Sequence, residues 1–324
     1  MMEVFRIGKR PIVLTLAVLA LLGGTVPAAA YSRSLRTRTT GVLAPEIAAP
    51  VAFRRPLTAL VPGAPDPFVT SGLGEFVAHC PLVRRAAMDP IVAPGNATFG
   101  HSHDFFGNKT VDHSSTTARL ERQPTSCLPS ADASAYWVPT LLTAGVPTDP
   151  TEFTIYYQVK RPYDPTKVTP FPSGLRMIAG DAMAMSEQPD YVVQWHCIGE
   201  SQGFAVIPDC GSHDLELVLT FPNCWDGINL DSANHKSHMF YGRGLNCPLS
   251  HPVLLPELSF RARWAVAGAR ATLSSDVMPG HTMPGGTTAH GDFMNVWEQA
   301  ELARRVTGCL TVARVCDASG AVIR

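Results

Sequence analysis

Residues 258–266 read LSFRARWAV, and this stretch alternates side chains with the two-residue period of a β-strand. Its apolar positions share one face and both arginines lie on the other, the apolar set being Leu258, Phe260, Ala262, Trp264 and Val266. Shorter stretches of similar character predict further strands at residues 154–159, 175–179, 191–197 and 215–221. Short strands separated by turns predict a mainly β fold, a sandwich or jelly-roll-like single domain with long loops.

One segment near the C-terminal end has a helical period instead. Its apolar residues follow the i, i+3, i+4, i+7 spacing of an amphipathic helix: Phe293, Val296, Trp297, Ala300 and Ala303. Asp292 fits as the N-cap and Gly308 as the stop. We therefore expect one C-terminal helix, over residues 292–306.

Composition limits the class of protein. The chain has 324 residues, a formal net charge of −1, 26 glycines and 28 prolines. The near-neutral charge argues against a nucleic-acid partner, and the glycine and proline content indicates many loops. Residues 31–72 are rich in Arg, Thr, Pro and Ala without periodicity, so we expect a flexible linker there. A single disulfide-bonded domain would then occupy residues 73–324.

The first 30 residues have the pattern of a signal peptide. Arg6, Lys9 and Arg10 precede an apolar run over residues 12–22, and a small-residue stretch follows at residues 26–30. The apolar run is short for a bilayer, so we expect cleavage and secretion, an uncleaved anchor being the alternative. No later segment is apolar enough to span a membrane, and we expect a secreted monomer.

The cysteines support an oxidising compartment. Their number is eight, and no Cys-x-x-Cys pair occurs, which favours disulfides over a zinc–thiolate site. Many connectivities remain open. Pairing of neighbours along the chain is the simplest scheme: Cys80–Cys127, Cys197–Cys210, Cys224–Cys247 and Cys309–Cys316.

The histidines fall into short groups. His101 and His103 would share one face of an extended segment, and His235 and His238 one face of a helix. His290 lies two residues before a carboxylate. Imidazoles on one face suit a divalent metal, and imidazoles beside carboxylates suit proton transfer. Structural hydrogen bonding is a third possibility, and the spacing alone does not decide among them.

Aromatic side chains offer a possible saccharide surface. Tyr136, Trp137 and Trp225 are the candidates for stacking on a sugar ring, although most large aromatics lie in a core. Trp225 is followed by Asp226 and a glycine, a turn that would leave its ring partly exposed.

Residues 221–231 read FPNCWDGINLD and are followed by HKSHM at residues 235–239. This stretch resembles the signature of the exported family known as domain of unknown function DUF1996. Further blocks agree in order between about residues 84 and 309: DPI at 89–91, GHSH at 100–103, SAYWVP at 134–139, PSGLRMIAGD at 172–181, CPLSHPV at 247–253 and HGDF at 290–293. The resemblance implies secretion, disulfides and one domain, and the modules fused to some relatives suggest a polysaccharide or cell-wall glycan as partner.

Two hypotheses follow. In the first, the protein is a carbohydrate-active enzyme, hydrolytic or lyase-like, whose site gathers His101, His103, His235, His238, His290, Asp181, Asp231, Asp292, Arg176 and Lys236. A divalent metal is a possible cofactor, with His101, His103 and His238 as ligands. In the second, it is a non-catalytic cell-wall or polysaccharide-binding module that uses Tyr136, Trp137, Trp225 and Asp226. Histidines that converge on one point would favour the first.

Overall fold

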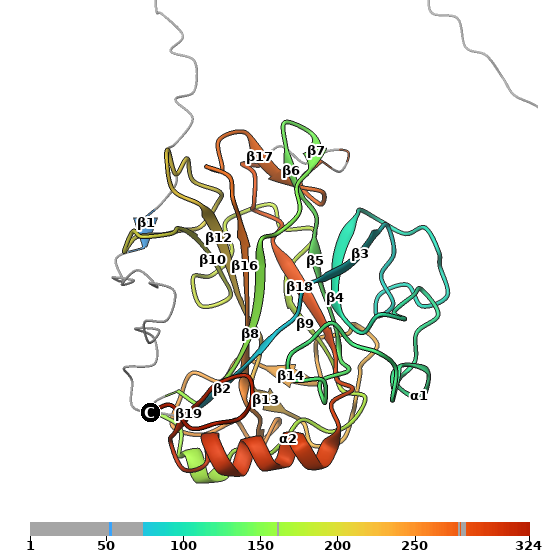
Figure 1. Cartoon of the computed structure of the whole chain (residues 1–324), viewed down its shortest axis with the longest axis vertical. Coiled ribbons are helices and arrows are strands. Elements are labelled where there is room, and N and C mark those ends of the chain that lie inside the picture. The colour runs from blue at the N-terminus through green and yellow to red at the C-terminus, as the bar shows by residue number, and fades with distance from the viewer. Residues whose placement is uncertain (1–51, 54–73, 161, 278, 280–282) are drawn as a thin grey trace, which may run out of the picture. The chain divides into compact units, whose positions relative to one another are not determined.

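The computed structural model describes residues 52–53, 74–160, 162–277, 279 and 283–324. Its largest sheet has eight strands in the order β1-β11-β10-β12-β16-β8-β2-β19. Their bounds are β1 Ala52–Phe53, β11 Gly203–Phe204, β10 Val193–Cys197, β12 Leu215–Thr220, β16 Glu257–Trp264, β8 Glu152–Gln158, β2 Glu75–His79 and β19 Val315–Cys316. All neighbours are antiparallel except the pair β19 and β2. Four of the five strands expected from the sequence, β8, β10, β12 and β16, lie together in this sheet (Figure 1), whereas the stretch at residues 175–179 forms a strand of the second sheet.

A second sheet has five strands in the order β3-β4-β5-β18-β9. Their bounds are β3 Leu82–Ala86, β4 His103–Gly107, β5 Ala135–Pro139, β18 His290–Met294 and β9 Arg176–Gly180. Two small three-stranded sheets complete the β structure: β13 Cys224–Trp225, β14 Met239–Phe240 and β15 Val253–Leu254 in one, and β6 Leu141–Thr143, β7 Val146–Pro147 and β17 Ala271–Leu273 in the other.

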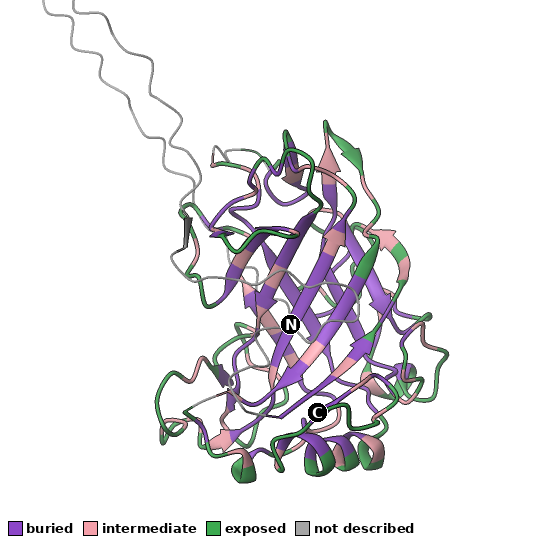
Figure 2. Cartoon of the chain, turned by 60° about the vertical axis from the view of Figure 1, so that its left-hand side comes forward, coloured by how far each residue is buried: buried purple, intermediate pink, exposed green. Residues whose placement is uncertain are grey.

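The two large sheets pack face to face and enclose the main core. Phe106 of β4 stacks on Phe153 of β8, with ring centroids 3.8 Å apart. Tyr136 of β5 meets Phe260 of β16 edge to face at 5.5 Å. Gly291 of β18 lies so close to the facing sheet that a Cβ there would come within 3.0 Å of the Leu219 side chain. Figure 2 shows buried residues along most of both layers, as a β-sandwich requires.

The C-terminal helix is shorter than its sequence pattern predicts. Helix α2 covers Gln299–Arg305, with Glu298 as N-cap, and a π turn continues it over Val306–Leu310, past Gly308. Residues 290–294, expected partly as helix, form β18, which pairs with both β5 and β9. A strand with partners on both sides satisfies more backbone groups than one helical turn would, so tertiary pairing overrides the local period. Two other short turns are the helix α1 Thr117–Leu120 and the 3-10 turn Pro165–Lys167.

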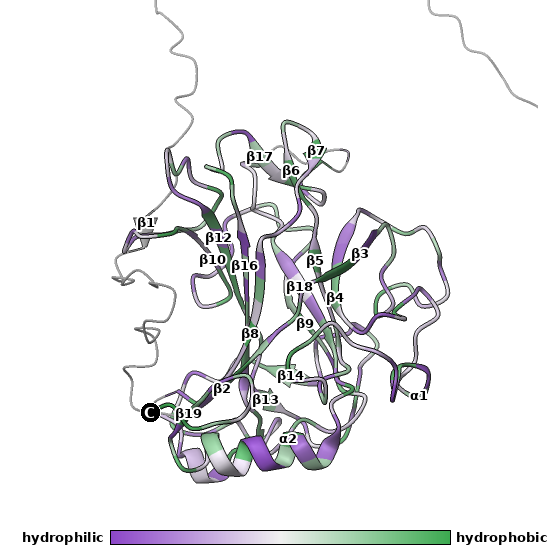
Figure 3. Ribbon diagram, in the orientation of Figure 1, coloured by the Kyte–Doolittle hydropathy of each residue, from purple (hydrophilic) through white to green (hydrophobic). Residues whose placement is uncertain are grey.

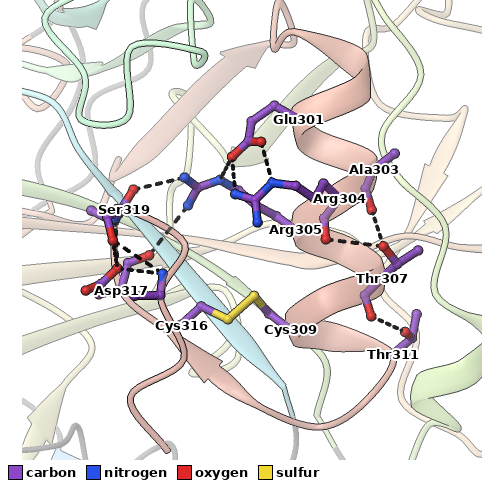
Figure 4. The surroundings of a disulfide bond; sticks show 12 residues. Glu301, Ala303, Arg304, Arg305, Thr307, Cys309, Thr311, Cys316, Asp317 and Ser319 are labelled. Carbon is purple, nitrogen blue, oxygen red and sulfur yellow. Dashed lines mark hydrogen bonds and ion pairs between the residues drawn. A yellow bond between two sulfur atoms is a disulfide. The ribbon is translucent and has the colours of Figure 1, made fainter.

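Helix α2 is fastened to the end of the chain by charge and by a disulfide (Figure 4). Glu301 accepts hydrogen bonds from Arg304 at 2.6 Å and from Arg305 at 2.8 Å. Arg305 is 1% exposed and donates to the carbonyl of Ala318 at 3.0 Å. The Cys309–Cys316 disulfide then closes the turn between the helix and β19.

The structure has four disulfides: Cys80–Cys127, Cys197–Cys210, Cys224–Cys247 and Cys309–Cys316. Each joins cysteines that are neighbours along the chain, as in the local pairing scheme. The bridges hold loops onto the sandwich; Cys224–Cys247 closes a 23-residue separation that carries β13 and β14. Such closures stabilise a fold mainly by restricting the unfolded chain.

Two expectations fall on residues outside the described ranges. The signal peptide at residues 1–30 and nearly all of the linker at residues 31–72 lie there, β1 being the exception. Among the described residues, no helix has the length and hydropathy needed to cross a membrane. Four disulfides together with this finding are consistent with an extracellular protein.

Candidate functional site

The five-stranded sheet carries polar residues on the face that points away from the main core. In β18, Gly291 and Phe293 face the core, so the alternation turns His290 and Asp292 to the outer face. His103 of β4 lies on that outer face as well, two residues before Phe105, which packs in a second, smaller core. Figure 3 shows the resulting hydrophilic colour on β4 and β18 within the sandwich. These strands are almost wholly buried, so their polar residues need a specific explanation.

Sheet register brings three histidines to one point. His103 pairs with Pro139 of β5, and Asp292 pairs with Trp137, so His290 lies level with the same proline from the other side. His101 precedes β4 by two residues, and its ring lies 4.3 Å from that of His103. The Nε2 of His290 is 3.1 Å from the Nε2 of His101 and 3.3 Å from the Nε2 of His103. In a tetrahedral site with bonds of about 2.0–2.1 Å, ligand atoms lie about 3.3–3.4 Å apart, so this spacing suits one small cation.

Hydrogen bonds at the other ring nitrogens fix two of the tautomers. Nδ1 of His103 lies 3.0 Å from the carbonyl of Met88, and Nδ1 of His290 lies 2.8 Å from the carbonyl of Thr288. Because a carbonyl only accepts, each Nδ1 carries the proton and donates it. In the neutral rings, the two Nε2 atoms then face each other with lone pairs, an arrangement that a shared cation would stabilise.

Burial keeps these rings neutral. It lowers the pKa of His101 to about 4, and burial together with the neighbouring His101 lowers the pKa of His290 to about 3. His103 is fully buried, and its pKa lies well below the ordinary value for the same reasons. Neutral imidazoles are the form that binds metals. His101 is half-buried, whereas His103 and His290 are 1% and 4% exposed, so access to the cluster runs past His101.

Two carboxylates lie beside the histidines. Asp292 is 0% exposed, and neither of its oxygens has a hydrogen-bond partner in the described part of the chain. Burial and the nearby Asp89 raise its pKa well above the ordinary value. Asp89, His103 and Asp292 offer ligand atoms that all lie within 4.8 Å of one another. The histidine cluster and this carboxylate pair therefore form one buried polar site joined at His103.

Asp89 belongs to the DPI block at residues 89–91 but was not one of the expected site residues. Its Oδ1 accepts the backbone N–H groups of Ile91 and Val92, both at 2.9 Å, and burial raises its pKa despite these bonds. An aspartate before a proline signals a turn of this kind. Nothing in that local pattern indicates that the turn lies against β18.

The loop between β13 and β14 lies along β9, the edge strand beside β18. His235 Nδ1 lies 2.9 Å from Asp231, which also accepts from Arg176 of β9 at 3.2 Å. Lys236 Nζ donates to the carbonyl of Gly180 at 2.8 Å, and its charge contributes to lowering the pKa values of both His290 and Asp292. His235 has a φ of 58°, a left-handed conformation that few side chains adopt. This loop thus supplies a cationic rim to the buried cluster.

Two expected site residues lie apart from the cluster. Nδ1 of His238 lies 3.0 Å from the Ser232 hydroxyl, and its Nε2 lies 2.7 Å from the carbonyl of Arg176. Because a carbonyl only accepts, Nε2 of His238 carries a proton, and Nδ1 faces the Ser232 hydroxyl. Neither nitrogen is directed at the cluster, and His290 occupies the place expected for His238. Asp181 is exposed and accepts the N–H of Met183 in a turn.

The surface role expected for two of the aromatics is wrong. Tyr136 and Trp137 are 0% exposed, since they sit in the middle of the five-stranded sheet and face the two cores. Trp225 is half-buried, and its Nε1 donates to the carbonyl of Asn229 at 2.7 Å. Asp226 accepts the N–H groups of Ile228 and Asn229, so it shapes the turn after the ring.

Comparison with known proteins places this chain in a family without assigning an activity. Neither the curated proteins nor the solved structures gave a match. A family model does match, over residues 89–297, a range that contains the three converging histidines, both carboxylates and the cationic loop. The chain therefore belongs to the family described as domain of unknown function DUF1996.

Proposed function

We propose that this protein is a secreted, metal-dependent, carbohydrate-active enzyme of hydrolase or lyase-like type. The observation that carries the proposal is the convergence of three histidines, in which the Nε2 of His290 lies 3.1 Å from that of His101 and 3.3 Å from that of His103. Three protein nitrogens with room for one further ligand are typical of catalytic zinc sites, and imidazole also suits copper.

A metal explains features that proton transfer alone does not. His101 and His290, with pKa values of about 4 and about 3, are neutral near neutral pH, which makes them poor general acids there. A neutral imidazole needs no proton removed before it binds a cation. Carbonyl acceptors at Nδ1 orient the rings of His103 and His290, as outer hydrogen bonds do in metal sites. A divalent ion bound there would supply Lewis acidity and lower the pKa of a coordinated water.

The surrounding residues supply the other groups that such chemistry needs. Asp292 and Asp89 have raised pKa values, so they can hold a proton and donate it to a leaving oxygen. Lys236 and Arg176, at the rim, can stabilise developing negative charge. The saccharide substrate is supported by the modules fused to relatives, and secretion by the N-terminal pattern and the disulfides.

Elemental analysis of the purified protein tests the metal. We expect about one equivalent of zinc or copper, lost in His101→Ala and His290→Ala and kept in His213→Ala, a half-exposed histidine beside Glu200. A panel of wall polysaccharides assayed with and without chelator tests the reaction. Absence of stoichiometric metal, together with behaviour unchanged by chelator, would remove the proposal.

A further inference from the structure

The outer face of the eight-stranded sheet bears a hollow of about 430 Å³ that the histidine site does not explain. Its floor consists of alternate residues of β8, β10, β12 and β16, the ones whose neighbours along each strand enter the core. Sites for small molecules range over roughly 300–1,000 Å³, so the hollow is large enough for a ligand. It lies across the sandwich from the histidines, on the other layer.

The floor is polar and combines uncharged side chains with one acidic and one basic residue, Glu257 and Arg261. Thr220 and Ser259 are cross-strand partners, as are Gln158 and Glu257, and Gln194 lies one strand further along the sheet. Hydroxyl and amide groups donate and accept hydrogen bonds without a fixed charge. A ligand rich in hydroxyl groups matches such a floor.

Planar side chains stack at the floor and the rim. The guanidinium of Arg261 lies 4.7 Å from the ring centroid of Tyr156 on the floor. At the rim, the guanidinium of Arg243 lies 4.1 Å from the ring centroid of Tyr191, whose ring meets that of Tyr241 at 5.6 Å. A stacked guanidinium directs its N–H donors sideways in its own plane, where they can reach two neighbouring hydroxyls. Tyrosine rings present apolar faces that match the C–H face of a sugar.

The rim is held in place before any ligand arrives. Tyr241 donates its hydroxyl proton to the carbonyl of Thr220 at 3.0 Å, which ties the rim to the floor. Gly242 lies so close to Cys224 that a Cβ would come within 2.6 Å of its sulfur, and Cys224 is bridged to Cys247. Preorganised binding groups lose little conformational entropy when they bind.

We propose that this hollow, bounded by Tyr156, Tyr191, Tyr241 and Arg243, is a saccharide-binding groove separate from the histidine site. The acidic and basic groups of the hollow partly neutralise one another, as Lys160 pairs with Glu257 of the floor at 2.5 Å. A neutral or weakly charged glycan fits this balance better than a polyanion does. The groove goes beyond the proposed reaction and does not depend on the metal.

A peptide partner fits less well. Peptides commonly bind by adding a strand to a sheet edge or by filling apolar pockets. The floor lies over the interior strands β12, β16 and β8, whose backbone groups already pair with both neighbours. Val218 is its one aliphatic lining residue among those described.

Isothermal titration calorimetry with cello-, chito-, xylo- and mannohexaose tests the groove on the purified protein. We expect at least one of these to bind. Tyr191→Ala should weaken that binding about three- to tenfold, and Arg243→Ala about tenfold or more, because each removes one stacked or charge-assisted contact. Both residues are exposed, so the fold should survive, which thermal unfolding checks.

Two controls separate this groove from the other site. Arg119→Ala removes an arginine on α1 whose side chain is 57% exposed and paired with Asp112, and it should leave binding unchanged. His290→Ala should also leave binding unchanged, whatever becomes of the metal. The inference is overturned if none of the hexasaccharides binds wild-type protein. It is equally overturned if binding survives both groove variants, or if His290→Ala abolishes it.

Discussion

A buried carboxylate makes the stability of this protein depend on pH in a predictable direction. Asp132 is 0% exposed and lies at the end of a chain of hydroxyls between the sheets. Trp297 Nε1 donates to the hydroxyl of Tyr157 at 2.8 Å, and this hydroxyl lies 2.7 Å from the hydroxyl of Tyr136. The Tyr136 hydroxyl in turn donates to Asp132 at 2.6 Å. Burial outweighs these bonds and raises the pKa of Asp132 to about 6.

The magnitude follows from that pKa and the ordinary value of 3.8. Between these two pH values, the folded protein holds a proton that the unfolded chain has released. The free energy of unfolding therefore falls as pH rises through this window. At about 1.36 kcal/mol for each pKa unit, we expect a loss of about 2–3 kcal/mol between pH 4 and pH 7 from this group alone.

Urea unfolding of wild type and of Asp132→Asn at several pH values isolates this contribution, because all other titrating groups are common to both proteins. The stability difference between them should change by about 2–3 kcal/mol from pH 4 to pH 7, the variant gaining relative to wild type. Asp209→Asn, an exposed carboxylate that accepts a turn N–H, serves as the matched control. Parallel pH profiles for wild type and Asp132→Asn would refute the reasoning.

Three further outcomes are expected. With zinc at about a hundred times its dissociation constant, the midpoint temperature of thermal unfolding should rise by about 5–10 °C for wild type and should not rise for His290→Ala. An equal rise in both proteins would contradict the assignment of His290 as a ligand. Gly291→Ala places a Cβ 3.0 Å from the Leu219 side chain, so urea unfolding should show a loss of about 1–3 kcal/mol; an unchanged midpoint would mean that the sheets separate easily. Replacing Cys224 and Cys247 together by serine should cost about 3 kcal/mol, from a loop of 23 residues, and a loss below 1 kcal/mol would show that the loop is ordered without its bridge.

The core strands could be predicted because their alternation is set by burial on one face. Residues 258–266 anticipated β16, whose Phe260 faces the core and whose Arg261 faces outward in the groove. The helix expected from Asp292 failed at its start because five residues with a helical spacing of apolar groups can also form a strand. Only pairing with β5 and β9 decides between them, and that pairing depends on residues more than 100 positions away.

The site shows the same limit. Sequence spacing could place His101 and His103 on one face, and the structure has their rings side by side. Sequence spacing could not identify His290 rather than His238 as the third histidine of the cluster, because that depends on the register of β18 against β5. The groove could not be predicted from the sequence for a related reason. Tyr191, Tyr241 and Arg243 come from loops, and no local sequence pattern determines where those loops lie.

The bridge between Cys224 and Cys247 encloses the chain that supplies both polar surfaces. From this segment, Asp231, His235 and Lys236 form the rim beside the histidine cluster, and Tyr241 and Arg243 border the groove on the other layer. If Cys224 and Cys247 were reduced, the segment between them would be held less firmly, both beside the histidine cluster and beside the groove. Oxidation of this single pair of thiols would thus fix the chain on both sides of the sandwich in one step.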